Sequence, residues 1–148
     1  MSKVLGIDPK NKGMPTAVYG DGVLCDLKIW SLGDFFEMVR ANWSRPDLIV
    51  IEDVQANKAI YTRNDVGGRK VAQQIAQRVG MNKQMQTVVM DIAEHYGVPV
   101  IAVKPTAANW ADDKARFEAA TGWTKQSNRD TRSAAYFGWL HRHKKADK

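Results

Sequence analysis

Two short stretches decide the fold of this chain: residues 4–8 read VLGID and residues 48–52 read LIVIE. Each is a run of four mostly apolar residues that ends in an acid. Such runs are typical of short strands that are buried on both faces of a sheet. Turn-forming or polar residues follow both runs, so Asp8 and Glu52 stand directly after two strand ends. If the two strands are neighbours, both carboxylates leave adjacent points of one sheet.

Between these two strands the sequence predicts a hairpin and a helix. Residues 16–19 and 23–29 have strand-forming patterns, and residues 20–22 (GDG) between them are typical of a hairpin turn. Ser31 can cap a following helix together with Asp34. The apolar side of that helix is expected to come from Phe35, Phe36, Val39 and Trp43.

The second half of the chain alternates between helical and strand patterns. Residues 54–68 are polar and predict a long loop. Apolar residues then recur at helical spacing from 69 to 96, and Gly80 within this stretch is expected to mark a kink, a break or a close packing contact. Residues 100–103 predict a further strand, and a last helix is expected from about residue 127.

This order of elements predicts an α/β fold. A three-stranded meander followed by βα alternation implies a mixed five-stranded sheet with helices on both faces. The chain of 148 residues is long enough to bury a core of its own. We therefore expect a single domain spanning residues 1–148, with a basic C-terminal tail over residues 141–148.

Composition and charge narrow the class of partner. The chain carries 22 Lys and Arg against 16 Asp and Glu, a net charge of +6, which favours a polyanion such as nucleic acid. It lacks the long apolar stretch of a membrane span and the pattern of a secretory signal, so no membrane partner is expected. Its single cysteine, Cys25, fits a reducing cytoplasm and is expected to be a small core residue on a strand.

The two acids at the strand ends point to divalent cations. A lone acid after a strand is usually a solvated turn residue, but two acids, each after a buried strand, favour a shared site. Mg²⁺ prefers oxygen ligands and keeps several waters, so a few convergent carboxylates suffice. Two such ions can activate water and stabilise the leaving oxygen of a phosphodiester. We expect Mg²⁺, with two ions in the site and Mn²⁺ able to replace them.

Four stretches carry a resemblance to a known family. They are residues 4–9 (VLGIDP), residues 49–55 (IVIEDVQ), residues 97–105 (GVPVIAVKP) after the long helix, and residues 127–135 (SNRDTRSAA). In this order they resemble motifs of the RuvC family of Holliday junction resolvases, particularly its phage-type members. The resemblance spans nearly the whole chain and implies a ribonuclease H-like fold.

The resemblance also implies the site residues. Asp8, Glu52 and Asp130 match the metal ligands of the family and are the expected catalytic residues. The fourth acidic position of the family pattern falls on Ser133, one helical turn after Asp130. A serine there can hydrogen-bond a water or a phosphate but adds no negative charge. Lys10 is a second departure, because the family usually has glycine after Asp-Pro.

A basic loop between the second acid and the long helix is a candidate DNA contact. Residues 57–65 mix cations and amides with Tyr61, which suits phosphate contacts and stacking on an unpaired base. Such a loop is equally typical of a solvated surface, and both interpretations remain open. The side chains that we expect to contact DNA are Lys10, Lys58, Tyr61, Arg63, Arg69, Lys70, Lys83, Lys104 and Lys114.

These observations predict a metal-dependent DNA endonuclease that resolves four-way junctions by symmetric phosphodiester hydrolysis in the cytoplasm. The two-fold symmetry of such a substrate calls for a homodimer, with contacts expected on the helix of residues 69–96. Two alternatives stay open. One is a nuclease of the same fold that cuts RNA–DNA hybrids or flaps. The other is a junction-binding protein with weakened catalysis, which Ser133 suggests.

Overall fold

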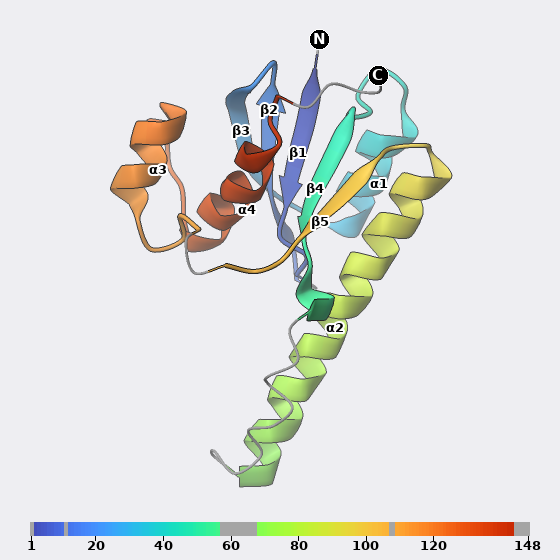
Figure 1. Cartoon of the computed structure of the whole chain (residues 1–148). Coiled ribbons are helices and arrows are strands. Elements are labelled where there is room, and N and C mark those ends of the chain that lie inside the picture. Colours follow the sequence, from blue (N-terminus) through green and yellow to red (C-terminus); the bar gives the residue numbers. More distant parts are fainter. Residues whose placement is uncertain (1, 11, 57–67, 107–108, 144–148) are drawn as a thin grey trace.

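The computed structural model describes residues 2–10, 12–56, 68–106 and 109–143, with the backbone alone at residue 56 and over residues 68–79. Its strands are β1 (Lys3–Ile7), β2 (Met14–Gly20), β3 (Val23–Trp30), β4 (Leu48–Glu52) and β5 (Val100–Val103). Its helices are α1 (Leu32–Arg40), a short 3-10 helix η1 (Val54–Ala56), α2 (Gly68–His95), α3 (Lys114–Thr121) and α4 (Arg129–Leu140). Figure 1 shows these elements in the colours of the sequence.

The strands form one five-stranded sheet in the order β3-β2-β1-β4-β5. β1 and β2 pair antiparallel, as do β2 and β3, whereas β4 is parallel to both β1 and β5. The meander with its GDG turn and the fifth strand are therefore confirmed, and the pairing of β1 with β4 makes the first and fourth strands neighbours. The sheet is mixed and α/β, as the sequence predicts.

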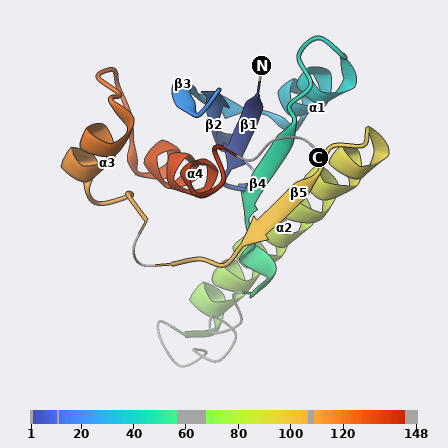
Figure 2. The same cartoon turned by 45° about the horizontal axis from the view of Figure 1, so that its top comes forward.

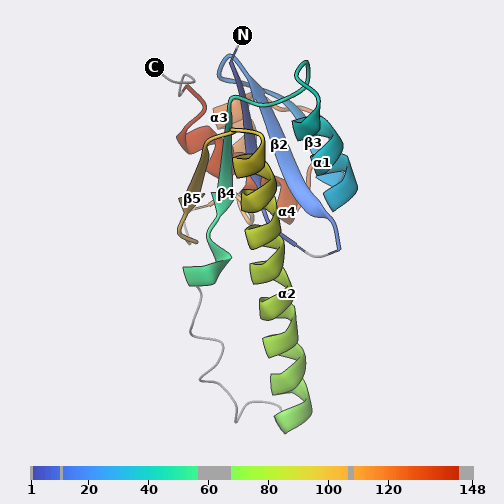
Figure 3. The same ribbon diagram turned by 90° about the vertical axis from the view of Figure 1, so that its right-hand side faces the viewer.

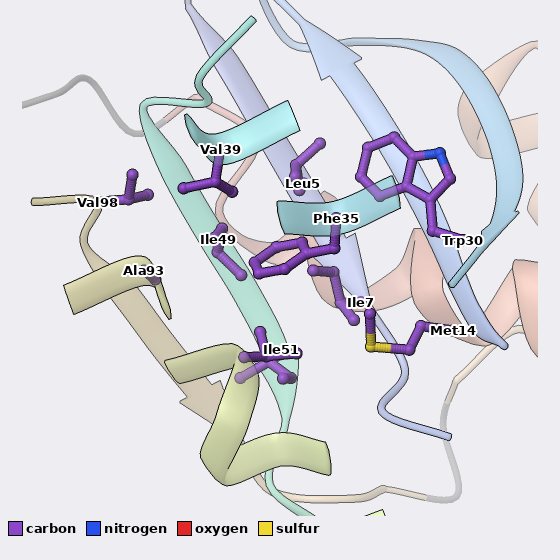
Figure 4. Close-up of a cluster of buried hydrophobic side chains, with 11 residues drawn as sticks. Leu5, Ile7, Met14, Trp30, Phe35, Val39, Ile49, Ile51, Ala93 and Val98 are labelled. Carbon is purple, nitrogen blue, oxygen red and sulfur yellow. The ribbon is translucent and has the colours of Figure 1, made fainter. Parts of the chain in front are cut away.

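Helices cover both faces of this sheet. α1 and α2 lie on one face and α4 on the other, as Figures 2 and 3 show from two sides. Alternate residues of each strand pack on opposite faces of the sheet, because successive side chains of a strand point in opposite directions. On the face of α1 and α2, a buried cluster joins strand residues to helix residues such as Phe35 and Val39 (Figure 4). The strand residues of this cluster include Leu5, Ile7, Ile49 and Ile51.

The helix α4 packs unusually close to the central strand. Gly6 of β1 lies against the backbone of Ala134 and Gly138 in α4, where a Cβ atom on Gly6 would overlap backbone atoms. The hydroxyl of Tyr19 in β2 donates a hydrogen bond to the carbonyl oxygen of Ala135 at 2.6 Å. Together these contacts fix the height and rotation of α4 above the sheet.

The start of α1 confirms the predicted cap, but its apolar side is narrower than expected. Ser31 and Asp34 form a reciprocal capping box. Phe35 is buried, whereas Phe36 is 36% exposed and Trp43 is 90% exposed. Trp43 lies beyond the end of α1 at Arg40, so helical periodicity no longer points it toward the core.

Two further features differ from what the sequence predicts. α2 runs through Gly80 without a break, and a Cβ atom there would meet no other described atom within 4 Å, so a break and a close packing contact at Gly80 are excluded. Cys25 is exposed rather than buried. It lies on the edge strand β3, where the alternation that buries Leu24 turns Cys25 outward. Within the described residues, no helix is long and apolar enough to cross a membrane.

Candidate active site

The pairing of β1 with β4 places the two predicted acids side by side. Ile7 lies opposite Ile51 in the parallel register, so Asp8 and Glu52 are the next residues on neighbouring strands. The backbone of Asp8 is held by a hydrogen bond from its N–H to the carbonyl oxygen of Pro15 at 3.0 Å. The side chains of Asp8 and Glu52 are hydrogen-bonded to each other. The expected juxtaposition is therefore present.

Strand alternation decides which face of the sheet carries these acids. Asp8 is an even number of residues from Val4, and Glu52 from Val50, so each acid lies on the same face of the sheet as that valine. Both valines belong to the buried cluster on the side of α4. The two acids consequently project toward the helix that carries Asp130. The next residue, Asp53, points to the opposite face of the sheet, toward α2. There its carboxylate accepts a hydrogen bond from the side chain of Gln86.

Burial and mutual repulsion disfavour two negative charges at this point. Asp8 is only 6% exposed, and burial raises the pKa of its carboxyl, while Lys10 opposes the shift. Burial, followed by the negative charge of Asp8, raises the pKa of Glu52 to about 8. In the absence of a cation, a protonated Glu52 thus donates its hydrogen bond to the Asp8 carboxylate. A proton or a cation nearby therefore relieves the repulsion between the two carboxyls.

Lys10 lies between Asp8 and Asp130. Its ammonium nitrogen Nζ is 3.9 Å from Oδ2 of Asp8 and 3.8 Å from Oδ1 of Asp130. Asp130 stands in the first turn of α4, and half of its side chain is exposed. The start of that helix is fixed by a capping box between Asn128 and Thr131. Lys10 therefore lies beside the acids, with 40% of its side chain exposed.

The third acid is not in direct contact with the other two. Among the side chains that the structure describes, no three carboxylates, imidazoles or thiols stand close enough together to ligate one ion. The donor set nevertheless suits a hard cation, because Asp8 and Glu52 are two desolvated carboxylates without a full counter-charge. Binding an ion between all three acids requires Lys10 to leave its position. The geometry suits a metal ion that is bound by the carboxylates of Asp8 and Glu52 together. Asp130 lies at the edge of such a site.

Ser133 lies one turn further along α4, on its inner side. It is 8% exposed, so little of this side chain is available to a substrate as the helix stands. A carboxylate at this position would be largely desolvated beside a site that already holds three acids.

The expected DNA contacts are placed unevenly. Lys58, Tyr61 and Arg63 lie outside the described residues, as does most of the predicted loop of residues 54–68. Arg69 and Lys70 lie in the first turn of α2, where the backbone alone is described. The three remaining lysines are spread over different elements, in the middle of α2, directly after β5 and at the start of α3: Lys83, Lys104 and Lys114. Lys114 also pairs with Glu118 at 4.0 Å.

Sequence reasoning missed one residue of this region, Gln86. It is 2% exposed and its side chain binds the turn that follows Glu52. The signal was present in the sequence: Gln86 shares the buried stripe of α2 with Val89 and Ala93, at helical spacings of three and seven. A glutamine in such a stripe needs buried hydrogen-bond partners.

Comparison with known proteins supports the fold. No protein-family model and no curated protein matches the sequence. A structure of Thermus thermophilus RuvC in complex with a Holliday junction substrate is similar, with a TM-score of 0.63 and 18% identity over 95% of this chain and 93% of that one. A second Thermus thermophilus RuvC structure gives a TM-score of 0.61 and 16% identity with the same coverage. The resemblance of the four sequence motifs to the RuvC family is confirmed at the level of the fold: this chain has the ribonuclease H-like fold of RuvC.

Proposed function

We propose that this chain is a metal-dependent endonuclease that resolves four-way DNA junctions by symmetric phosphodiester hydrolysis. The nuclease is a single domain of residues 1–148 that acts in the cytoplasm as a homodimer, with one site in each subunit. Asp8, Glu52 and Asp130 are its proposed catalytic residues. The similarity to a RuvC structure that holds a junction substrate supports the choice of DNA.

One observation carries the proposal: a buried carboxylate, Asp8, and a half-buried one, Glu52, meet at the ends of the neighbouring strands β1 and β4, on the side of α4. Keeping two acids desolvated and in contact is unfavourable for the fold. Perturbed carboxylates of this kind gather at functional sites, because burial and neighbouring like charges are the means by which such sites tune a pKa. Their chemistry suits oxygen-liganded cations better than any other bound group.

Asp8 and Glu52 would hold Mg²⁺, or Mn²⁺ in its place, with Asp130 completing the donor set. When bound, such ions, two in each site, activate the attacking water and stabilise the leaving oxygen of the phosphodiester. The chain itself supplies rigidity: Asp8 is anchored by the carbonyl oxygen of Pro15 and buried at the end of the central strand. Lys10 can turn its ammonium from the acids to a DNA phosphate, since 40% of its side chain is exposed.

The experiment is incubation of the protein with a labelled mobile four-way junction, a linear duplex and an RNA–DNA hybrid in Mg²⁺. Paired, symmetric nicks confined to the junction are expected. Asp8→Asn and Glu52→Gln should each abolish cleavage and leave junction binding largely intact, because phosphate contacts dominate affinity. Asp26→Asn, which removes an acid from the edge strand β3, is the control and should cleave normally. Full activity of Asp8→Asn or Glu52→Gln would overturn the site assignment.

A second candidate, a junction-binding protein with weakened catalysis, is favoured by two observations. The fourth acidic position is a buried serine, and Lys10 already pairs with two of the acids. This candidate predicts tight, salt-sensitive junction binding without cutting in Mg²⁺ or Mn²⁺. Activity gained by Ser133→Asp would identify it. Cutting confined to the hybrid or to flaps would instead identify a different nuclease on the same fold.

A further inference from the structure

The segment that follows Glu52 is fastened to α2 by one buried side chain. The side-chain oxygen of Gln86 accepts hydrogen bonds from the backbone N–H of Val54 at 2.9 Å and of Gln55 at 3.2 Å. Its amide nitrogen donates to Oδ1 of Asp53 at 3.1 Å. Gln86 itself is 2% exposed, whereas its partners Asp53 and Val54 are half-buried and Gln55 is exposed. Three consecutive residues after the candidate ligand therefore share one partner.

The same segment is held on its other side by the sheet. The backbone N–H of Asp53 donates to the carbonyl oxygen of Val103 in β5 at 2.7 Å. Gln55 adds a second link to the helix, because its side-chain amide donates to the hydroxyl of Thr87 at 2.8 Å. The chain on the carboxyl side of Glu52 is thus fixed between β5 and α2, which leaves the Glu52 backbone little freedom.

Strand alternation separates the roles of the two adjacent acids. Glu52 projects toward α4 and contacts Asp8, whereas Asp53 projects to the opposite face and contacts Gln86. Asp53 is consequently an anchor for the strand end and not a further ligand. Any axial shift or rotation of α2 at Gln86 is passed through three hydrogen bonds to the three residues that follow Glu52.

We propose that Gln86 is a positioning residue, which holds the Glu52 carboxylate in the orientation needed for metal binding and couples that orientation to α2. The inference rests on the proposed function, because it concerns the same site. Outer partners that orient a ligand commonly change metal affinity or activity by about 10- to 100-fold when they are removed. Gln86 differs from such partners in acting on the backbone beside the ligand.

The test begins with Gln86→Met, which keeps the length of the side chain and removes its polar atoms. Amide exchange followed by NMR should become faster at Val54, whose N–H loses its acceptor. The effect should be smaller at Gln55, whose N–H also donates to Oδ1 of Asp53 at 3.2 Å. The dissociation constant for Mn²⁺ should rise by about tenfold or more. For a mobile junction in Mg²⁺, kcat should fall while KM is unchanged. The control is Gln84→Met, an exposed position on the same helix, which should change none of these.

A second part of the test exchanges the carboxylate and the amide between residues 53 and 86, so that the net charge is unchanged. It does not require the core to accommodate a methionine. Gln86→Glu alone places a carboxylate against that of Asp53 and should weaken Mn²⁺ binding further. Combining Gln86→Glu with Asp53→Asn reverses donor and acceptor at the same atoms and restores a bond between the two residues. The double variant should recover slow amide exchange and most of the Mn²⁺ affinity.

The outcomes separate this proposal from the proposed function. Fast amide exchange in Gln86→Met with unchanged Mn²⁺ affinity and unchanged kcat would overturn the positioning role and leave Gln86 purely structural. Failure of the double variant to bind Mn²⁺ better than Gln86→Glu would also overturn it. If the unaltered protein cleaves no junction, the proposed function fails, while Mn²⁺ affinity and amide exchange still decide the role of Gln86.

Discussion

At the scale of single residues, the main feature of the site is the need to neutralise the negative charge of Asp8 and Glu52. Both carboxyls are desolvated, and the pKa of each is raised by burial. Lys10 supplies one nearby ammonium group, but at 3.9 Å from Asp8 it makes no short hydrogen bond. A proton, Lys10 and a divalent cation are therefore alternative means of neutralising the same pair. This competition makes two single substitutions informative.

The first prediction concerns pH in the absence of divalent metal. Since folding raises the pKa of Glu52 from its ordinary 4.5 to about 8, the folded protein keeps a proton that the unfolded chain has lost between these values. The free energy of unfolding should therefore fall as pH rises through that window. Glu52→Gln cannot ionise and should unfold at a higher temperature than the unaltered protein at about pH 9 in EDTA, with a smaller difference at about pH 5.

Thermal unfolding followed by circular dichroism at both pH values checks this expectation. Glu94→Gln, an exposed position on α2, is the matched control and should follow the unaltered protein. Added Mn²⁺ should raise the unfolding temperature of the unaltered protein at high pH, because metal binds the deprotonated carboxylates. Equal pH dependence in Glu52→Gln and the unaltered protein would show that Glu52 does not carry the effect.

The second prediction concerns the ammonium group beside the acids. Lys10→Gln removes a positive charge that repels an incoming cation, so Mn²⁺ should bind more tightly. A unit charge at about 4 Å contributes on the order of 1 kcal/mol in a water-like medium, which corresponds to several-fold up to about tenfold in affinity. Isothermal titration calorimetry measures the change. Lys12→Gln, two residues further and exposed, should bind Mn²⁺ as the unaltered protein does. Weaker binding by Lys10→Gln would contradict a competitive role for Lys10.

At the scale of elements, the position of α4 on β1 decides whether Asp130 reaches the other acids. The helix approaches the strand so closely because Gly6 and Gly138 present no side chain at the crossing. Tyr19 locks the same crossing through its bond to Ala135. Close approach of this kind depends on glycine at the point of contact. The site is therefore sensitive to substitutions that do not touch its carboxylates.

The third prediction compares two glycines. Gly6→Ala forces α4 away from β1 and should lower the free energy of unfolding by about 1–3 kcal/mol, a typical cost of overpacking. Gly80→Ala, inside α2 with no atom within 4 Å of the new methyl group, should raise it by about 1 kcal/mol through helix propensity. Urea unfolding measures both. A stability of Gly6→Ala equal to that of the unaltered protein would show that α4 is free to shift on the sheet.

At the scale of the whole molecule, α2 is the element that extends beyond the body. Its first half continues past the end of the sheet, as Figures 1 and 3 show. Its second half packs on the sheet through residues such as Val89 and Ala93. Between these halves, Met81 is 38% exposed. An exposed apolar side chain at the point where α2 leaves the sheet suits contact with a second copy of the chain.

The fourth prediction follows from this arrangement. Light scattering coupled to size exclusion should give twice the chain mass of 16.6 kDa at micromolar concentration. Met81→Glu should lower that mass toward one chain and replace paired nicks with single, uncoordinated ones. Gln84→Glu adds the same charge to an exposed position of α2 and should remain a dimer. A mass of one chain for the unaltered protein, with or without junction DNA, would contradict the dimer.

Local patterns in the sequence determined much of this protein. The apolar runs ending in Asp8 and Glu52 predicted two buried strands, and the GDG turn predicted the hairpin. The Ser31 cap and the start of the last helix near residue 127 were predicted in the same way. These features succeed because capping, turn formation and hydrophobic periodicity depend on residues that are near one another in the chain.

Only the tertiary structure decided how distant segments meet. The position of Lys10 between two acids and the burial of Ser133 depend on the placement of α4 over β1. The exposure of Cys25 follows from the place of β3 at the edge of the sheet, and the role of Gln86 from the rotation of α2. Strand order and helix rotation arise from packing across the whole core, which no local pattern contains. The sequence by itself thus determined the elements and the candidate acids, while packing determined what surrounds each acid and holds it in place.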